Sequence, residues 1–380
     1  MQKTVYVLGA GFSMEYGAPS QSKLLEAIFE LKNIKFQGGK EIVKEWVREL
    51  EDFMEDGLKV LANERKHYSL EDIYTPIDKS IIESISFRQY TPQQLFNLRD
   101  IINRLVIVAL RSEIEKNPDR KKTIDKFARY VVENCKQQIE DEKLDTVSII
   151  TTNWDTILDN NIYRIINSDE IPEGHKFSGV LDYCCYISSL DENDNKIKPG
   201  MYALGKGRYN VKLLKLHGSL NWLQCPKCSR LFVKLYTNYL GGYVTPKKYC
   251  RHCEKNFGTK NDDTNKLFTN IITPTFLKNL NNVQNKLVWQ NAAIELSEAS
   301  KVVFIGYSLP QADFEFKQVL SRMIRSNAEI EVFLVDQDNP TNFSGDAKYN
   351  TAGYRFQNFF SGRNPRIEYG GVKQFLKELS

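Results

Sequence analysis

The sequence predicts an α/β protein built around a parallel sheet that is buried on both faces. Short, nearly continuous apolar runs rich in valine and isoleucine recur along the chain, which is typical of strands that helices cover on both sides. Long segments with apolar residues at helical spacing separate these runs. With 380 residues, 41% of them hydrophobic, the chain is long enough to bury a large core.

The first element is a strand at 4–9 that ends in a glycine turn and is followed by a helical pattern at 22–31. Strand, glycine turn and helix form the opening unit of a Rossmann-like nucleotide-binding fold. Further strands are predicted at Thr146–Thr152, Leu213–Leu216, Val302–Gly306, Ile330–Val335 and Arg366–Tyr369.

Between the first two strands, apolar residues recur at helical spacing, which predicts a helical insertion at 36–140 within a single domain of residues 1–380. Thr91 and Pro92 are a favourable N-cap and first-turn pair. Ser69 with Asp72 has the spacing of a capping box.

Charge, apolar runs and the N-terminal pattern together argue against several classes of protein. The net charge is +4, so a strongly basic nucleic-acid arm is not the dominant feature. Lys247, Lys248 and Arg251 form only a small basic cluster, which a solvated face explains, and direct nucleic-acid binding is not expected. The apolar run Leu105–Leu110 is too short to span a membrane. Without a signal-peptide pattern, a cytoplasmic location is expected.

Two Cys-x-x-Cys pairs separated by 21 residues form the most specific motif in the chain. Each pair can present two thiolates to one ion, so the pattern predicts a structural Zn²⁺ site in a module at 222–260. Four thiolates leave no open position for water, so catalytic zinc is not expected. The predicted ligands are Cys225, Cys228, Cys250 and Cys253, whereas Cys135, Cys184 and Cys185 are expected in the core.

The glycine turn Gly9-Ala10-Gly11-Phe12-Ser13 is a candidate nucleotide site. Its two glycines would allow close approach to a pyrophosphate beside the positive end of the next helix. Many α/β folds use such a pair only as a tight turn. The spacing to Gly17 departs from that of dehydrogenases, so the turn is a dinucleotide loop of another type or no site at all.

Other polar residues follow the predicted strands where ligands bind in open parallel sheets. Asn153 and Asp155 follow one strand, and either ligand binding or capping of the next helix explains them equally well. His217 follows another strand. It is a candidate general base, because histidine titrates near neutral pH, although a lone histidine is more often structural.

Two later strands end in similar residues. Ser308 follows a strand that ends at Gly306, and a small hydroxyl there can bind phosphate or ribose. Asp336 ends the next predicted strand and could accept hydrogen bonds from ribose hydroxyls.

In combination, these motifs resemble the sirtuin family from residue 5 to about 340, apart from the helical insertion. The resemblance rests on Gly-Ala-Gly-Phe-Ser, Thr-Asn-Trp-Asp, Leu-His-Gly, the paired Cys-x-x-Cys and Gly-Tyr-Ser, in that order. The variants are more similar to bacterial sirtuin-like NAD hydrolases of antiphage defence than to protein deacylases. Ser-Leu-Glu-Asp-Ile-Tyr at 69–74 is also similar to segments of that group.

The resemblance implies a role for each matching position. Asn153 would lie under the scissile N-glycosidic bond of NAD, Asp155 would hold the nicotinamide carboxamide, and His217 would act as general base. The remaining positions would contact NAD elsewhere: Gly9, Ala10, Gly11 and Ser13 the pyrophosphate and adjoining ribose, Gly306 and Ser308 phosphate or ribose, and Asp336 the adenosine side.

The sequence also departs from deacylases. They follow the glycine loop with a Pro-x-Phe-Arg-like element, whereas this chain has Pro19-Ser20-Gln21-Ser22. They carry Phe-Gly-Glu in the acyl-lysine channel, whereas this chain has 272–278, Ile-Thr-Pro-Thr-Phe-Leu-Lys. The expected function is therefore hydrolysis of NAD, as substrate, to nicotinamide and ADP-ribose. The alternatives are an NAD-dependent deacylase or ADP-ribosyltransferase, and a non-enzymatic NAD or ADP-ribose sensor.

Uncontrolled NAD hydrolysis would kill the host, so the activity is expected to be gated. The chain after Asp336 is shorter than the usual domain minimum of about 50 residues, so no attached sensor domain is expected. The regulator is then homo-oligomerisation or a separate protein, and the resemblance implies a HerA-type ATPase partner.

Overall fold

The computed structural model describes residues 2–33, 40–116, 121–168, 179–191, 197–198, 208–235, 249–258, 263–273, 275, 278, 280 and 282–379. Contacts divide the chain into two compact units. The sheet unit comprises Met1–Tyr16, Asp119–Ile271 and Leu280–Ser380, and the helical unit comprises Gly17–Pro118 and Ile272–Asn279. These bounds differ from the predicted insertion at 36–140, and the domain limits drawn from the sequence stay a prediction.

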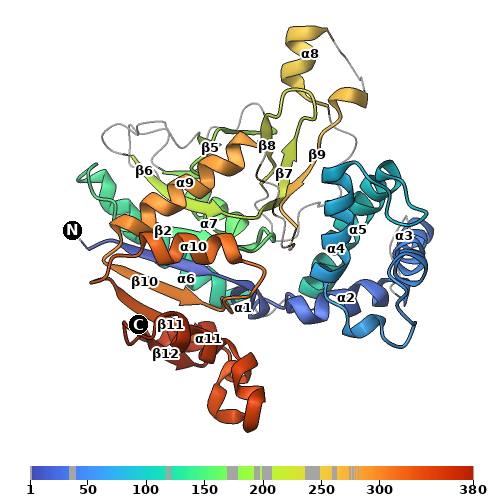
Figure 1. Cartoon of the computed structure of the whole chain (residues 1–380). Helices are drawn as coiled ribbons and strands as arrows, with labels where there is room; N and C mark the ends of the chain where they lie inside the picture. Colours follow the sequence, from blue (N-terminus) through green and yellow to red (C-terminus); the bar gives the residue numbers. More distant parts are fainter. Residues whose placement is uncertain are drawn as a thin grey trace. The chain divides into compact units, whose positions relative to one another are not determined.

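The sheet unit confirms the predicted α/β class with a parallel sheet (Figure 1). Within the described residues, eight strands pair in the order β12-β11-β10-β1-β2-β6-β3-β5, and each pair is parallel. Their bounds are β1 Thr4–Leu8, β2 Val147–Thr151, β3 Gly179–Asp182, β5 Ile197–Lys198, β6 Tyr209–Lys215, β10 Lys301–Ile305, β11 Glu329–Leu334 and β12 Arg366–Tyr369.

Strand β1 lies between β2 and β10, so later strands are added to the sheet on both sides of it. This makes β1 the topological switch point of the sheet. Leu8 is in register with Thr151 of β2 and with Ile305 of β10, so the carboxyl ends of the three strands are level. In open parallel sheets, ligands bind beyond the carboxyl ends at such a switch point.

Helices cover both faces of the large sheet, which explains why its strands read as continuous apolar runs. Tyr6 of β1 packs edge-on against Phe127 of α6 and Phe375 of α12. Phe304 of β10 points to the opposite face and packs on Phe356 of α11. In Figure 1, α9 and α10 lie in front of the sheet and α6 and α7 behind it. The helices are α1 Ala10–Met14, α6 Lys121–Lys136, α7 Ile157–Ser168, α9 Val283–Glu298, α10 Phe314–Met323, α11 Ala352–Phe359 and α12 Gly371–Glu378.

A second, smaller sheet, which the sequence analysis did not predict, carries the cysteine motifs. It has the order β4-β8-β7-β9 in the described residues, with β7 antiparallel to both of its neighbours. Its elements are β4 Ile187–Ser189, β7 Gly218–Gln224, β8 Leu231–Val233 and β9 Phe268–Ile271, and helix α8 Arg251–Phe257 follows β8 in the chain. Three of its strands, β4, β8 and β9, have only three or four residues, which show too little periodicity to be recognised in a sequence.

The helical unit contains the two predicted helix starts. The Ser69 hydroxyl accepts from the Asp72 amide, and the Asp72 carboxylate accepts from the Ser69 amide. Thr91 and Gln94 form a second capping box, with Pro92 in the first helical position. No helix in the described ranges is long and apolar enough to cross a membrane. The helices are α2 Gln21–Glu30, α3 Lys40–Asp52, α4 Leu70–Glu83 and α5 Pro92–Glu115.

A charged network joins the amino-terminal ends of the central strands to α9. The Lys3 ammonium lies 2.6 Å from Asp145, 2.6 Å from Glu295 and 2.8 Å from Glu298. Lys212 of β6 lies 2.7 Å from both Asp145 and Glu295. Burial would raise the pKa of the Asp145 carboxyl, but the two lysines hold it below its usual range.

We expect Asp145→Asn to lower the free energy of unfolding at pH 7 by about 1.5–3 kcal/mol, the usual loss for a hydrogen bond to a charged group. Because the pKa of Asp145 is lower in the folded chain, its contribution is present above the unfolded pKa of about 3.9 and is lost as the pH falls through the folded value. Chemical denaturation between pH 3 and 7 measures both effects.

The exposed Asp346 provides the control, because Asp346→Asn should leave the stability nearly unchanged. A wild-type advantage over Asp145→Asn that persists undiminished at pH 3 would contradict this account of the network.

Candidate functional site

Five neighbouring parallel strands, β11, β10, β1, β2 and β6, end at one edge of the large sheet. The site residues predicted outside the cysteine motifs all follow these ends, within the sheet unit. They are Asp336 after β11, Gly306 and Ser308 after β10, Gly9, Ala10, Gly11 and Ser13 after β1, Asn153 and Asp155 after β2, and His217 after β6.

A chain of hydrogen bonds joins the loops after β1 and β2. The Asn153 side-chain Nδ2 donates to the Gly9 carbonyl oxygen at 2.8 Å and to Ser13 Oγ at 3.0 Å. The Ser13 hydroxyl in turn donates to Asp155 Oδ2 at 2.6 Å. Because a carbonyl oxygen only accepts, the contact with Gly9 requires Nδ2 to face the glycine turn. The orientation of the Asn153 amide is therefore set.

Asp155 serves as a helix cap and also belongs to this chain. Its Oδ1 accepts from the Ile157 amide at 3.0 Å, at the start of α7. Burial raises the pKa of the Asp155 carboxyl, while Lys215 and the Ser13 hydrogen bond act in the opposite direction. The capping role that the sequence left open is thus present, and it does not prevent contact with Ser13.

A buried ion pair between Lys215 and Asp159, which the sequence analysis missed, holds the backbone of Asp155 in place. The Lys215 ammonium donates to the Asp155 carbonyl oxygen at 2.5 Å and lies 2.9 Å from Asp159. The Lys215 and Asp159 side chains are only 1% and 2% exposed, and the Tyr183 hydroxyl donates to Asp159 at 2.7 Å. The available signal was a lysine inside an apolar strand, since such a charge needs a buried partner.

His217 is buried just beyond β6. The indole Nε1 of Trp289 donates to the preceding carbonyl, that of Leu216, at 2.8 Å, which fixes the backbone beside the ring. His217 Nε2 lies 3.4 Å from Asp313 Oδ1. The sequence analysis did not select Asp313, although an aspartate directly before the helical pattern of α10 was a visible signal.

The glycines after β1 and β10 pack against each other. The Gly11 amide donates to the Gly306 carbonyl oxygen at 2.8 Å. A Cβ at Gly9 would lie 2.5 Å from the Tyr307 Cα, and one at Gly306, where φ is +61°, would lie 2.3 Å from the Phe12 nitrogen. Close backbone packing therefore explains these glycines without a ligand, and their contact with a pyrophosphate stays a prediction. At this turn, Ala10 is exposed.

The remaining predicted positions, Ser308 and Asp336, follow β10 and β11, which lie on the same side of β1 in the strand order. Ser308 is half-buried, and its carbonyl oxygen accepts from Arg355 Nε at 2.9 Å. This contact places a guanidinium beside Ser308, which the sequence analysis did not foresee. Asp336 is exposed and begins a 3₁₀ turn at Asp336–Asp338.

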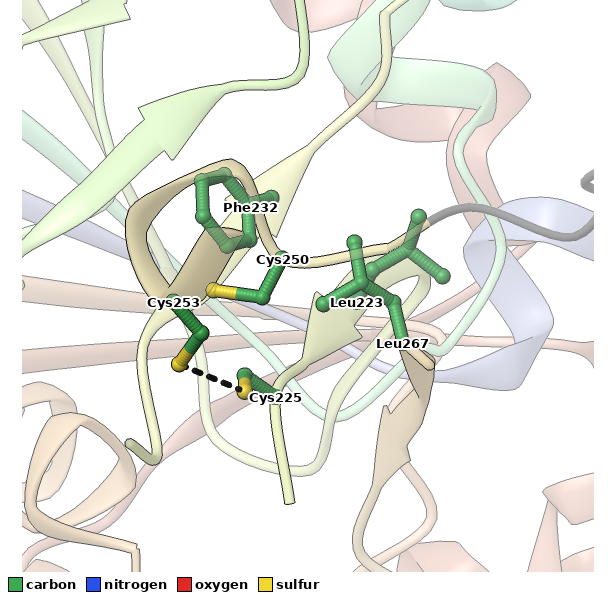
Figure 2. Close-up of a cluster of buried hydrophobic side chains, with 6 residues drawn as sticks. All are labelled: Leu223, Cys225, Phe232, Cys250, Cys253 and Leu267. Carbon is green, nitrogen blue, oxygen red and sulfur yellow. Dashed lines mark hydrogen bonds between the residues drawn. The ribbon is translucent and has the colours of Figure 1, made fainter. Parts of the chain in front are cut away.

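The four cysteines of the two Cys-x-x-Cys pairs come together, as predicted. Figure 2 shows three of them, Cys225, Cys250 and Cys253. The sulfurs of Cys225 and Cys253 are 3.8 Å apart and those of Cys228 and Cys250 are 3.7 Å apart. Four ligands about 2.3 Å from a tetrahedral ion have sulfurs about 3.8 Å apart, whereas a disulfide brings them to about 2.05 Å. The cluster could therefore bind a metal ion. The other three cysteines, Cys135, Cys184 and Cys185, are buried in the core, as predicted.

Apolar side chains enclose the cysteine cluster, and Figure 2 shows Leu223, Phe232 and Leu267 around the sulfurs. Arg251 anchors the module, because its guanidinium donates to the Ser189 and Leu190 carbonyl oxygens and lies 4.9 Å from the Phe232 ring. Arg251 thus has a role within the fold. The other members of the small basic cluster, Lys247 and Lys248, lie outside the described residues.

Comparison with known proteins finds similarity only among solved structures. No protein-family model matches the sequence, and no curated protein matches it. A structure of a Sir2 homologue in complex with NAD is 11% identical, with 99% of this chain and 87% of that chain covered and a TM-score of 0.42. A mutant Sir2 homologue in complex with ADP-ribose is 14% identical, with 100% and 90% covered and a TM-score of 0.41. Both of these structural neighbours are Sir2 homologues.

The glycine packing predicts a large cost for a single methyl group. We expect Gly306→Ala to lower the free energy of unfolding by more than about 2 kcal/mol, because a clash with Phe12 adds to a left-handed penalty of about 1–2 kcal/mol. Gly345 has nearly the same φ, +59°, but nothing lies within 4 Å of its Cβ position. Gly345→Ala should therefore show the left-handed penalty alone. If both variants lost the same free energy of unfolding in urea denaturation, the loop after β10 would not pack against the loop after β1 as described.

Proposed function

We propose that the protein hydrolyses NAD⁺ at the bond between nicotinamide and ribose. The observation that carries this proposal is the fixed Asn153 amide, which the Gly9 carbonyl and Ser13 hold at the switch point of the sheet. A neutral amide suits a reaction that passes through a transient positive charge, because it orients a nucleophile without forming a fixed ion pair. His217 lies on the same edge, after β6.

In the proposed reaction, the bond between ribose C1′ and the pyridinium nitrogen breaks, and its electron pair leaves with nicotinamide. The ribose passes through an oxocarbenium-like state, and a water oxygen bonds to C1′. Because the Asn153 Nδ2 is engaged with Gly9 and Ser13, its Oδ1 is the atom that would accept a hydrogen bond from this water. His217 would take the water's proton.

Water is favoured over an acyl-lysine peptide as the acceptor by the segment after β9. In the helical unit, the Thr273 hydroxyl donates to the Asp78 carboxylate, and Arg99 lies 2.6 Å from the same carboxylate. Thr273 therefore has a structural role within the helical unit, and the segment 272–278 reads Ile-Thr-Pro-Thr-Phe-Leu-Lys where deacylases carry Phe-Gly-Glu. Pro274, Phe276 and Leu277 lie outside the described residues.

We also propose that this activity depletes NAD in bacterial antiphage defence, in the cytoplasm, and that it is gated by self-assembly or by a HerA-type ATPase. The sequence resemblance to defence NAD hydrolases supports this part of the proposal. A gate follows from the chemistry, since free NAD hydrolysis would be lethal to the cell that makes the enzyme.

The four-cysteine cluster is proposed to hold a structural Zn²⁺ ion. Sulfur spacings of 3.7 and 3.8 Å fit a tetrahedral thiolate site, and four thiolates leave no position open for a reacting water. The ion would join the β7–β8 turn to the start of α8, which are distant in the sequence.

The activity is tested by measuring nicotinamide release from NAD⁺ by the full-length protein. We expect release without any peptide, and a reduction of at least about 10²-fold in Asn153→Ala and His217→Ala, the usual contribution of a positioned acid or base. His67→Ala, at an exposed histidine of the helical unit, should retain wild-type activity.

Two additions to the same assay, an acetyl-lysine peptide and a HerA-type ATPase, distinguish hydrolysis from deacylation and test whether the activity is gated. Release that requires an acetyl-lysine peptide would replace the hydrolase with a deacylase. Release only after a HerA-type ATPase is added would support the gated hydrolase. Nucleotide binding without release under all three conditions would favour the sensor and contradict the proposal.

Metal analysis tests the zinc site. We expect one Zn²⁺ ion per chain, and its loss in the double variant Cys250→Ser/Cys253→Ser, with a lower melting temperature because the ion stabilises the folded module. Cys135→Ala changes a buried cysteine outside the cluster and should keep the full zinc content. A zinc-free protein purified from zinc-replete cells would contradict the assignment.

A further inference from the structure

We propose that Asp313, itself held by Tyr307, is the positioning residue that sets the orientation and tautomer of the His217 ring. This inference rests on the proposed function only in giving His217 the role of base. The contacts that support it come from the loop after β10 and the first turn of α10, which are more than 85 residues from His217 in the chain.

Asp313 occupies the N-cap of α10, but its side chain makes no cap hydrogen bond there. An aspartate at this position ordinarily accepts from an amide of the first helical turn. Here one carboxylate oxygen lies 3.4 Å from His217 Nε2, and the other accepts from the Tyr307 hydroxyl at 3.0 Å. The carboxylate is thus directed at the histidine and the tyrosine.

Burial strengthens the electrostatic interaction between Asp313 and His217. The side chains of His217 and Asp313 are 7% and 8% exposed, and Tyr307 is buried. Phe316, three residues after Asp313 and on the same side of α10, packs edge-on against both Tyr307 and Trp289. In so little water, a carboxylate interacts with an imidazole more strongly than it would at the surface.

The arrangement has a consequence for the chemistry of the ring. A carboxylate beside Nε2 favours the tautomer with the proton on Nε2, so the lone pair lies on Nδ1. When Nδ1 takes a proton from water or a ribose hydroxyl, the carboxylate stabilises the resulting imidazolium. At 3.4 Å, Nε2 does not form a hydrogen bond to the Asp313 carboxylate in the substrate-free chain, and we propose that the contact shortens when substrate binds, as such contacts often do.

Two measurements on Asp313→Asn test the proposal. Nitrogen-15 NMR of the substrate-free protein should show His217 with Nε2 protonated in the wild type, and a loss of this single tautomer in Asp313→Asn. NAD⁺ hydrolysis should show kcat lowered about 10²–10⁴-fold with KM changed less than threefold. In a His217→Ala background, Asp313→Asn should have no further effect on kcat. Tyr307→Phe should give a smaller loss of kcat than Asp313→Asn.

Asp159→Asn is the matched control, because Asp159 is also a buried carboxylate that accepts from a tyrosine hydroxyl, but its ion-pair partner is Lys215. This variant should leave the His217 tautomer unchanged. An unchanged tautomer in Asp313→Asn, or additive losses with His217→Ala, would overturn the proposal. If the protein does not cleave NAD⁺, the NMR result still decides whether Asp313 sets the ring, so failure of the function and failure of this inference are distinct.

Discussion

Close packing of two glycine-containing loops, after β1 and β10, fixes the loop that follows β1 at the carboxyl edge of the sheet. The Gly11 amide reaches the Gly306 carbonyl, and the Cβ positions of Gly9 and Gly306 are filled by neighbouring backbone. Because backbone atoms meet here without side chains between them, the loop after β1 is held at a definite place. Asn153 then finds the Gly9 carbonyl and Ser13 within hydrogen-bond distance.

Buried charges hold the polar groups around this packing. Lys215 is fixed by Asp159 and supports the backbone of Asp155, while Asp313 faces His217. A buried charge is costly unless it has a partner, so each of these groups restricts the position of its neighbour. The polar groups at this edge of the sheet are thus held in definite orientations by buried partners.

The cysteine module is organised by a different principle. Three of its four strands are short, and three buried apolar side chains, with the partly buried Leu190, surround the four sulfurs in a small core. Small cores of this kind commonly need a metal ion or cross-link to be stable. The module has only a small core of its own, whereas the large sheet is buried by helices on both faces.

By itself, the sequence was sufficient for the α/β class, the main parallel strands, the Ser69–Asp72 capping box, the helix start at Thr91 and Pro92, and the grouping of four cysteines. These features come from local periodicity and spacing, which are visible along the chain. The sequence also placed Asn153, Asp155 and His217 at strand ends, because strand ends follow from the same periodicity.

Only the tertiary structure decided which groups face one another. The pairing of Lys215 with Asp159, the contact of Asp313 with His217 and the second sheet all join segments far apart in the sequence. The glycines had two explanations in the sequence, and the packing of Gly9 against Tyr307 supplied the structural one. Such contacts depend on strand order and register, and these are set by the packing of the whole sheet rather than by any local pattern.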